Sequence, residues 1–109
     1  MARMTSEALL AWRRLFSAVL TLTCESGTVQ QRLADAYLSN LEPLHGDPAA
    51  LPEVIRTEFA LVQAEVVGSE SVLGHDFLRE TIEHMDREQA RRIAGRIVAM
   101  YDKLAREAA

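Results

Sequence analysis

The sequence predicts an all-α protein: a small four- to five-helix bundle in which neighbouring helices run up and down. Apolar residues recur at intervals of three and four along the chain, and the alternating runs typical of β-strands are missing from the sequence. There are only five glycines and three prolines to interrupt helices. A chain of 109 residues, 49% hydrophobic and 26% charged, suits one folded domain spanning 1–109.

The first helix is expected over 6–24, which contains the only tryptophan and the densest aliphatic run. Thr5 or Ser6 is the expected N-cap, and Glu7 is favourable in the first turn. Large apolar residues recur at helical spacing, which predicts an inner face that neighbouring helices, a second copy of the chain or a membrane must cover. That predicted inner face consists of Leu9, Trp12, Phe16 and Val19, and Leu15 and Leu22 widen it.

The pair Arg13-Arg14, followed by an apolar run and Cys24, has an alternative interpretation as an export or lipoprotein signal. A signal starts with a polar, positive segment, whereas the residues before Arg13 are apolar and include Glu7. The apolar run after Arg14 is also too short to span a bilayer. We therefore expect a core helix of a cytoplasmic protein, a compartment that suits a lone cysteine.

Helix-capping signals place the next two helices at 28–42 and 52–67. Thr28 with Gln31 forms a capping box, and Pro43 should end the second helix near Glu42. Pro52 suits the first position of the third helix. The predicted inner face of the third helix consists of Ile55, Phe59, Val62 and Val66.

The last two helices are expected at 76–84 and 87–106. Asp86 with Gln89 forms a second capping box before the final helix. Gly95 lowers helix propensity, which suggests a close contact between helices at that point. The predicted inner face of the final helix consists of Ala90, Ile93, Ala94, Ile97, Val98, Tyr101 and Leu104.

Charge is unevenly distributed along the chain, although the net charge is only −4. The segment 42–86 contains ten acidic and two basic residues, whereas 87–106 contains six basic and two acidic ones. One use of this basic surface is binding of nucleic-acid phosphates. Its alternatives are pairing with the acidic segment, within one chain or across a dimer, and a plain solvated face. The predicted basic surface consists of Arg87, Arg91, Arg92 and Arg96.

The segment from Arg79 to His84 has an arginine, four residues and a histidine, and it resembles the short motif of HEPN-type ribonucleases. The resemblance implies that Arg79 orients a scissile phosphate and that His84 acts in proton transfer or charge stabilisation. The intervening Glu80 and Glu83 would repel RNA, so the alternative is an exposed Arg–Glu pair beside a surface histidine. Glu80, Glu83 and His84 also have metal-ligand character, but the other helices offer no matching set. We predict no catalytic residue, no metal and no cofactor.

Three longer segments resemble a set of small bacterial all-helical proteins of unknown function. They are TVQQRLADAY (28–37), LPEVIRTEF (51–59) and MDREQARRIAGRIVAMYDKL (85–104). Their shared motifs are helix caps and core positions. The resemblance therefore implies a helical fold in a bacterial cytosol and implies no activity.

Several large apolar residues lie off the main stripes of their helices, and leftover apolar surface usually marks an interface. We therefore expect a non-enzymatic protein–protein interaction or regulatory module that forms a homodimer or docks on another protein, without a membrane partner. The alternatives are a nucleic-acid-binding protein that uses the last helix, or a HEPN-like ribonuclease. Leu61 and Leu73 are among the off-stripe residues, and the interface candidates are Leu10, Trp12, Leu20 and Met100.

Overall fold

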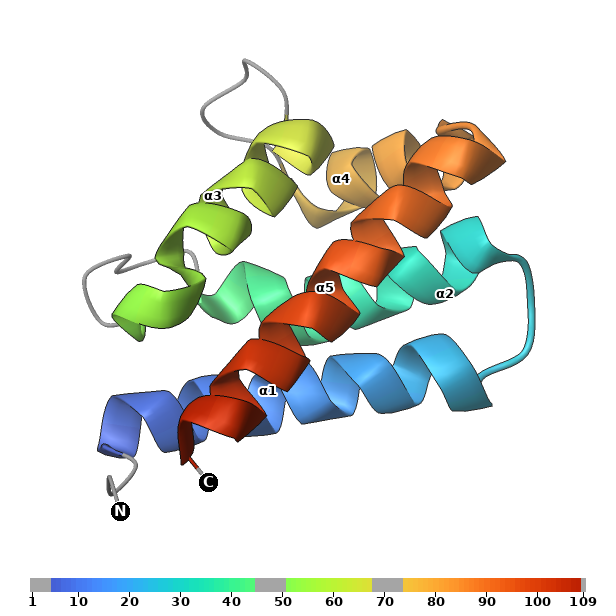
Figure 1. Ribbon diagram of the computed structural model, residues 1–109. Helices are drawn as coiled ribbons and strands as arrows, with labels where there is room; N and C mark the ends of the chain where they lie inside the picture. The colour runs from blue at the N-terminus through green and yellow to red at the C-terminus, as the bar shows by residue number, and fades with distance from the viewer. Residues whose placement is uncertain (1–4, 45–50, 68–73, 109) are drawn as a thin grey trace.

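The computed structural model describes residues 5–44, 51–67 and 74–108, and in these ranges the chain is helical, without a strand. The predicted all-α class is therefore confirmed. Figure 1 shows the five α-helices and the path of the chain between them. They are α1 (Ser6–Cys24), α2 (Val29–Ala36), α3 (Glu53–Val67), α4 (His75–His84) and α5 (Arg87–Ala108).

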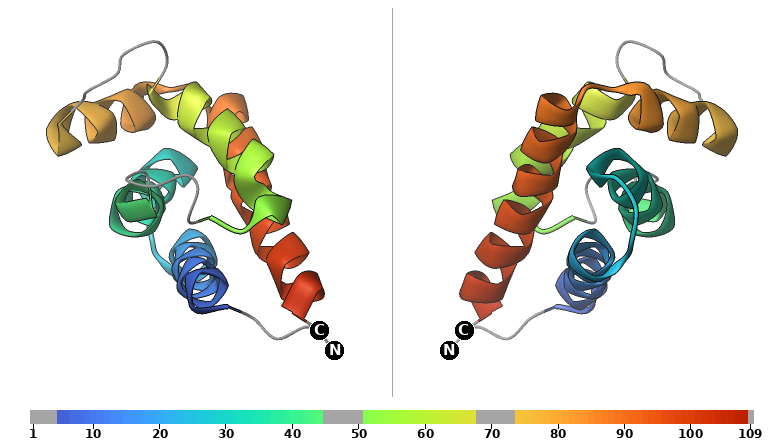
Figure 2. Two further views of the ribbon diagram at one scale, coloured as in Figure 1. Left: turned by 90° about the vertical axis from the view of Figure 1, so that its left-hand side faces the viewer. Right: turned by 90° about the vertical axis from the view of Figure 1, so that its right-hand side faces the viewer.

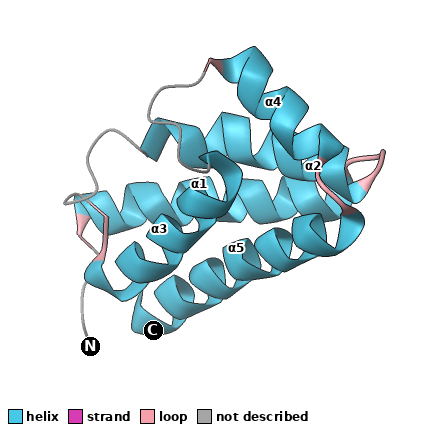
Figure 3. Cartoon of the chain, turned by 90° about the horizontal axis from the view of Figure 1, so that it is seen from above, coloured by secondary structure: helices cyan, strands magenta, loops and turns pink. Residues whose placement is uncertain are grey.

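The helices form two packed layers. In the end-on views of Figure 2, α1 and α2 make one layer as an antiparallel hairpin, and α3 and α5 make the other. α4 lies over α2, and α5 packs on α1, α2 and α3. Seen from above in Figure 3, the helices enclose a shared interior, which apolar side chains from every helix fill.

Side-chain caps fix the start of α1 and the turn into α2. Thr5 accepts a hydrogen bond from the Ala8 amide at 3.1 Å. Thr28 accepts one from the Gln31 amide, and the Gln31 side chain accepts one from the Thr28 amide, so the predicted capping box is confirmed. Gly27 has φ 105°, and a Cβ there would lie 2.6 Å from Gln31 Oε1. The turn therefore requires glycine on two counts.

The predicted helix 28–42 changes its hydrogen bonding part-way along. After α2 the chain forms a π-helix at Tyr37–Leu41 and a 3₁₀ turn at Glu42–Leu44. Pro43 has no N–H to donate to the Ser39 carbonyl, four residues earlier. Arg14 Nη1 of α1 donates to that carbonyl instead, at 3.3 Å. One arginine thus ties α1 to the irregular end of the second helix.

The π-helix carries two buried polar side chains. The Asn40 side-chain amide donates to the Ala36 carbonyl at 3.2 Å, which satisfies a donor that would otherwise be costly to bury. Burial raises the pKa of the Tyr37 phenol well above its ordinary value, and the nearby Glu42 carboxylate raises it further. Tyr37 is therefore held in its neutral form.

The buried side of α1 matches the predicted one only in part, since Leu15 and Leu22 are buried as expected. Leu9 and Phe16 of the predicted inner face are exposed, and Trp12 and Val19 are half-buried. A narrower strip of mostly small residues faces the interior, because small side chains let helices approach closely while large ones fit only at the edge of the contact. The buried residues of α1 are Ala8, Ala11, Leu15, Ala18 and Leu22.

The predicted inner face agrees with the structure for α3 and only in part for α5. The predicted inner face of α3 is confirmed, since Ile55, Phe59, Val62 and Val66 are all buried. On α5 the buried stripe is Ala90, Ile93, Ile97, Met100 and Leu104. Val98 is exposed, contrary to prediction, and Met100 is fully buried. A side chain at Gly95 would meet open space, so the expected close contact between helices there is wrong.

Replacing a leucine of α1 tests which side faces the core. We expect Leu15→Ala to lower the free energy of unfolding by about 3 kcal/mol, because Leu15 is fully buried and the change leaves a cavity. Leu10→Ala is the matched control on the exposed side, with an expected change within about 0.5 kcal/mol. Chemical denaturation measures both, and equal losses would contradict the observed orientation of α1.

The neutral Tyr37 predicts a pH dependence of stability. Above pH about 10 an unfolded tyrosine loses its proton, whereas native Tyr37 keeps it. The unfolded chain then binds fewer protons than the native one, so stability falls by up to about 1.4 kcal/mol per further pH unit. Tyr37→Phe should remove this part of the decline, as measured by denaturation between pH about 9 and 11. An unchanged slope in the variant would contradict the assignment.

Candidate functional site

Three aromatic rings form a cluster where α1 crosses α5. Trp12 and Phe16 stack with centroids 5.3 Å apart and planes within 6°. Tyr101 of α5 lies 6.0 Å from Trp12 and 5.9 Å from Phe16. The cluster covers the outer edge of the contact between the two helices, and its rings remain partly open to solvent.

Exposed aliphatic side chains extend this cluster on both helices. Leu9 and Leu20 lie seven residues before and four after Phe16, which places them on one side of α1. Val98 precedes Tyr101 on α5 by three residues. The exposed fractions are 41% for Leu9, 39% for Phe16, 44% for Leu20 and 42% for Val98. We call this surface the α1–α5 apolar face; it consists of Leu9, Trp12, Phe16, Leu20, Val98 and Tyr101.

Of the predicted interface residues, only two lie on the α1–α5 apolar face. Trp12 and Leu20 belong to it, whereas Leu10 is exposed on another side of α1. Met100 is completely buried in the core, so its prediction as an interface residue is wrong. Sequence reasoning missed Val98, because it was assigned to the core of the last helix.

The remaining exposed apolar residues do not extend this face. Val54 and Leu61 are exposed on α3, and Phe77 is exposed on α4. Leu73 lies outside the described residues. Single apolar side chains at a surface are ordinary, and these three carry no functional interpretation.

The predicted basic surface is divided between two sides of α5. Arg92 and Arg96 lie toward α3, where Glu65 Oε1 is 3.5 Å from Arg92 Nε and Glu58 Oε2 is 3.6 Å from Arg96 Nη1. Lys103 also approaches Glu58, at 3.9 Å. These are ion pairs within one chain, as the alternative interpretation of the charge pattern expected. One buried oxygen of Glu65 and the Arg96 Nε have no hydrogen-bond partner among the described residues.

The other two arginines of that predicted surface stand apart from this network. Arg87 and Arg91 are exposed, with no ion pair or hydrogen bond to any residue in the described ranges. They are separated from Arg92 and Arg96 by roughly a third of a turn around α5. The four arginines therefore do not form one open basic face.

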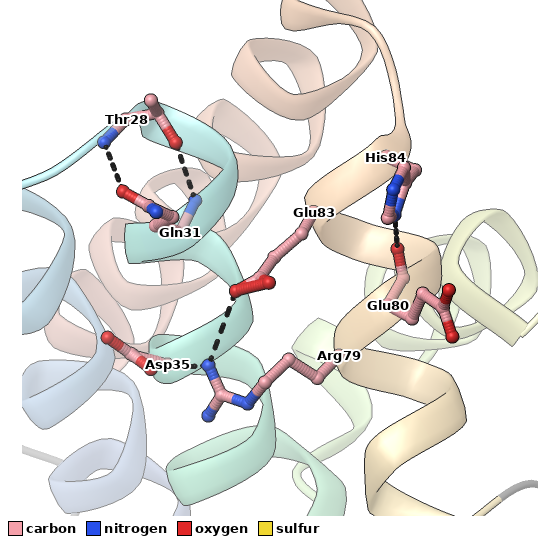
Figure 4. Close-up of polar contacts among 7 residues, drawn as sticks. All are labelled: Thr28, Gln31, Asp35, Arg79, Glu80, Glu83 and His84. Carbon is pink, nitrogen blue, oxygen red and sulfur yellow. Dashed lines mark hydrogen bonds and ion pairs between the residues drawn. The ribbon is translucent and has the colours of Figure 1, made fainter.

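The ribonuclease-like pair is not assembled. Arg79 points toward α2, where its Nη1 lies 2.8 Å from Asp35 Oδ1 and 3.8 Å from Glu83 Oε1 (Figure 4). His84 lies on another side of α4 and bonds the Glu80 carbonyl through Nδ1 at 2.8 Å. The two side chains therefore lie on different sides of α4, and each has a partner of its own.

The described residues were also compared with three other kinds of site: a surface pocket, a metal centre and a membrane span. An open hollow on α4 is lined by Phe77, Glu80, Thr81 and His84, which are successive positions along one side of a single helix. In the described part of the chain, no three acidic, histidine or cysteine residues are grouped to hold a metal ion. None of the helices described combines the length and the hydropathy that crossing a bilayer requires.

Comparison with protein-family models, with curated proteins and with solved structures found no significant match for the chain. Functional inference therefore depends on the surface itself.

The Asp35–Arg79 pair predicts a structural role for Arg79. A double-mutant cycle of Asp35→Ala and Arg79→Ala should give a coupling of about 0.5–1 kcal/mol in the free energy of unfolding, because both side chains are more than two-fifths exposed. His84→Ala is the matched control on the same helix and should change stability by less than about 0.5 kcal/mol. A coupling near zero would contradict the tethering of α4 to α2.

Proposed function

We propose that this protein is a non-enzymatic protein–protein interaction or regulatory module whose binding surface is the α1–α5 apolar face. The observation that carries the proposal is the continuity of that face. Three aromatic rings and three exposed aliphatic side chains lie together across two helices. Aromatic residues are enriched at the centres of protein interfaces, where they bury large areas at low conformational cost.

Nucleic-acid binding is the alternative that the charges favour least. Two of the four arginines in the predicted basic surface are already paired with carboxylates of α3. A net charge of −4 opposes approach to a polyanion. Ribonuclease activity has no support from the positions of Arg79 and His84.

The setting we propose is the cytosol of a bacterium. Its support is the resemblance of three segments to small bacterial helical proteins, together with the single cysteine. Cys24 is a free, exposed thiol, and a chain with one cysteine forms no internal disulfide.

Site-specific photo-crosslinking tests the proposed surface. A benzophenone amino acid at Leu20 would stand on the face, and one at Leu61 would stand on α3 as a control with the same 44% exposure. We expect irradiation of purified protein, or of bacterial lysate containing it, to join a second polypeptide to position 20. The partner is either another copy or a different protein. No adduct at position 20, or equal adducts at both positions, would overturn the proposal.

A further inference from the structure

We infer that the occupant of the α1–α5 apolar face is a second copy of this chain, with α1 of each copy packed on α5 of the other. This inference depends on the proposed function, since it names the partner for the same face. The arrangement is a two-fold dimer whose axis runs along the line where α1 meets α5. The supporting observations are the charges at the edges of the face, their height along it, and its size.

Level with the ring cluster, the two edges of the face carry opposite charges, whereas nearer the start of α5 the same edge carries Arg87 and Arg91. Arg13 follows Leu9 by four residues and precedes Phe16 by three, so it borders the face on the α1 side. It is exposed, and it makes no ion pair or hydrogen bond with any residue in the described ranges. Asp102 follows Val98 by four residues and borders the face on the α5 side, with 56% of its side chain exposed. Its ion-pair partner is Arg106, on the same helix.

Arg13 and Asp102 stand at the same height along the line between the helices. The rings of Trp12 and Phe16, on either side of Arg13 in sequence, both contact the Tyr101 ring, and Asp102 follows directly. A two-fold axis along this line keeps the height of each residue and exchanges the two edges. Arg13 of each copy is then placed opposite Asp102 of the other, and the pair occurs twice.

The size of the face also suits a second copy. From Leu9 to Leu20 the face extends about 17 Å along α1, and two adjacent helices, each about 10 Å wide, give it a footprint of about 340 Å². Each partner in a standard interface buries about 800 Å². The face is therefore large enough to form the centre of a dimer interface.

Gly95 has a role in this arrangement that it lacks within one chain. It lies seven residues before Asp102 and hence on the same side of α5. A side chain there would meet open space in the chain itself, so no internal contact explains a residue that weakens the helix. In the dimer, the absence of a side chain at Gly95 allows α1 of the partner to approach the backbone of α5.

Charge exchange tests this dimer specifically. Size exclusion with light scattering, over protein concentrations from about 1 to about 100 µM, should show a dimer that dissociates on dilution. We expect Arg13→Glu and Asp102→Arg each to weaken dimerisation by about tenfold or more, because each places like charges opposite one another twice. The double variant again places opposite charges against each other, with the signs exchanged. The dissociation constant of its dimer should therefore lie within about threefold of the wild-type value.

Two further variants separate the possible outcomes. Glu107→Arg, a charge reversal on another side of α5, is the control and should leave the dimer unchanged, whereas Phe16→Glu should abolish it. A wild-type monomer throughout the dilution series would overturn the inference. The same holds for a dimer insensitive to the single changes, or one that the double change does not restore. A monomer that still crosslinks another protein through position 20 would leave the proposed function standing.

Discussion

The packing of the alanine-rich side of α1 against its neighbours is the contact on which the rest of the molecule depends. Ala11 and Ala18 are almost completely buried, and small side chains allow the helix axes to come close. α5 packs on α1, α2 and α3, so the position of α1 relative to α5 also sets how the two layers meet. Because the close contact has no room for the larger side chains of α1, Trp12 and Phe16 lie at its outer edge. The apolar surface is thus a consequence of how the core is packed.

Arginine provides much of the polar attachment between elements. Arg14 reaches the Ser39 carbonyl, Arg32 the Leu22 carbonyl at 2.8 Å, and Arg79 the Asp35 carboxylate. A guanidinium presents several donors on a long stem, which suits carbonyls left open at helix ends. A positive charge employed in this way is not available to an external polyanion. The arginine content of the chain therefore overstates how basic the surface is.

Sequence reasoning predicted the elements well and their orientation only in part. Caps such as Thr28 with Gln31 depend only on residues close in sequence, so they could be predicted. α1 also has the expected bounds. The inner face of α3 was also readable, because its large apolar residues occupy only one narrow stripe. α1 has large apolar residues over more than half its circumference. For this helix, hydrophobicity alone did not distinguish the close contact from its edge, and the choice depended on alanines at positions 8, 11 and 18.

Only part of the α1–α5 apolar face could be predicted, because hydrophobicity does not tell an exposed apolar residue from a buried one. Leu20 lay off the predicted stripe and is exposed, but Met100 lay off it as well and is fully buried. The ring cluster joins residues 85 or more positions apart, and no local pattern shows that Tyr101 meets Phe16. The division of the arginines depends on where α3 lies, which only the tertiary arrangement determines. The π-helix was likewise not predicted, because only the short turn Glu42–Leu44 follows it, which is too few residues for a shift in the apolar periodicity to be recognised.

That shift has an evolutionary consequence. A π-helical segment such as Tyr37–Leu41 is equivalent to an ordinary helix with one additional residue inserted. The insertion turns every residue after it by about 100° relative to α2. A relative of this protein with an uninterrupted second helix should therefore be one residue shorter between the arginine at position 32 and the proline at position 43. An alignment that ignores this difference would match buried residues of one chain with exposed residues of the other.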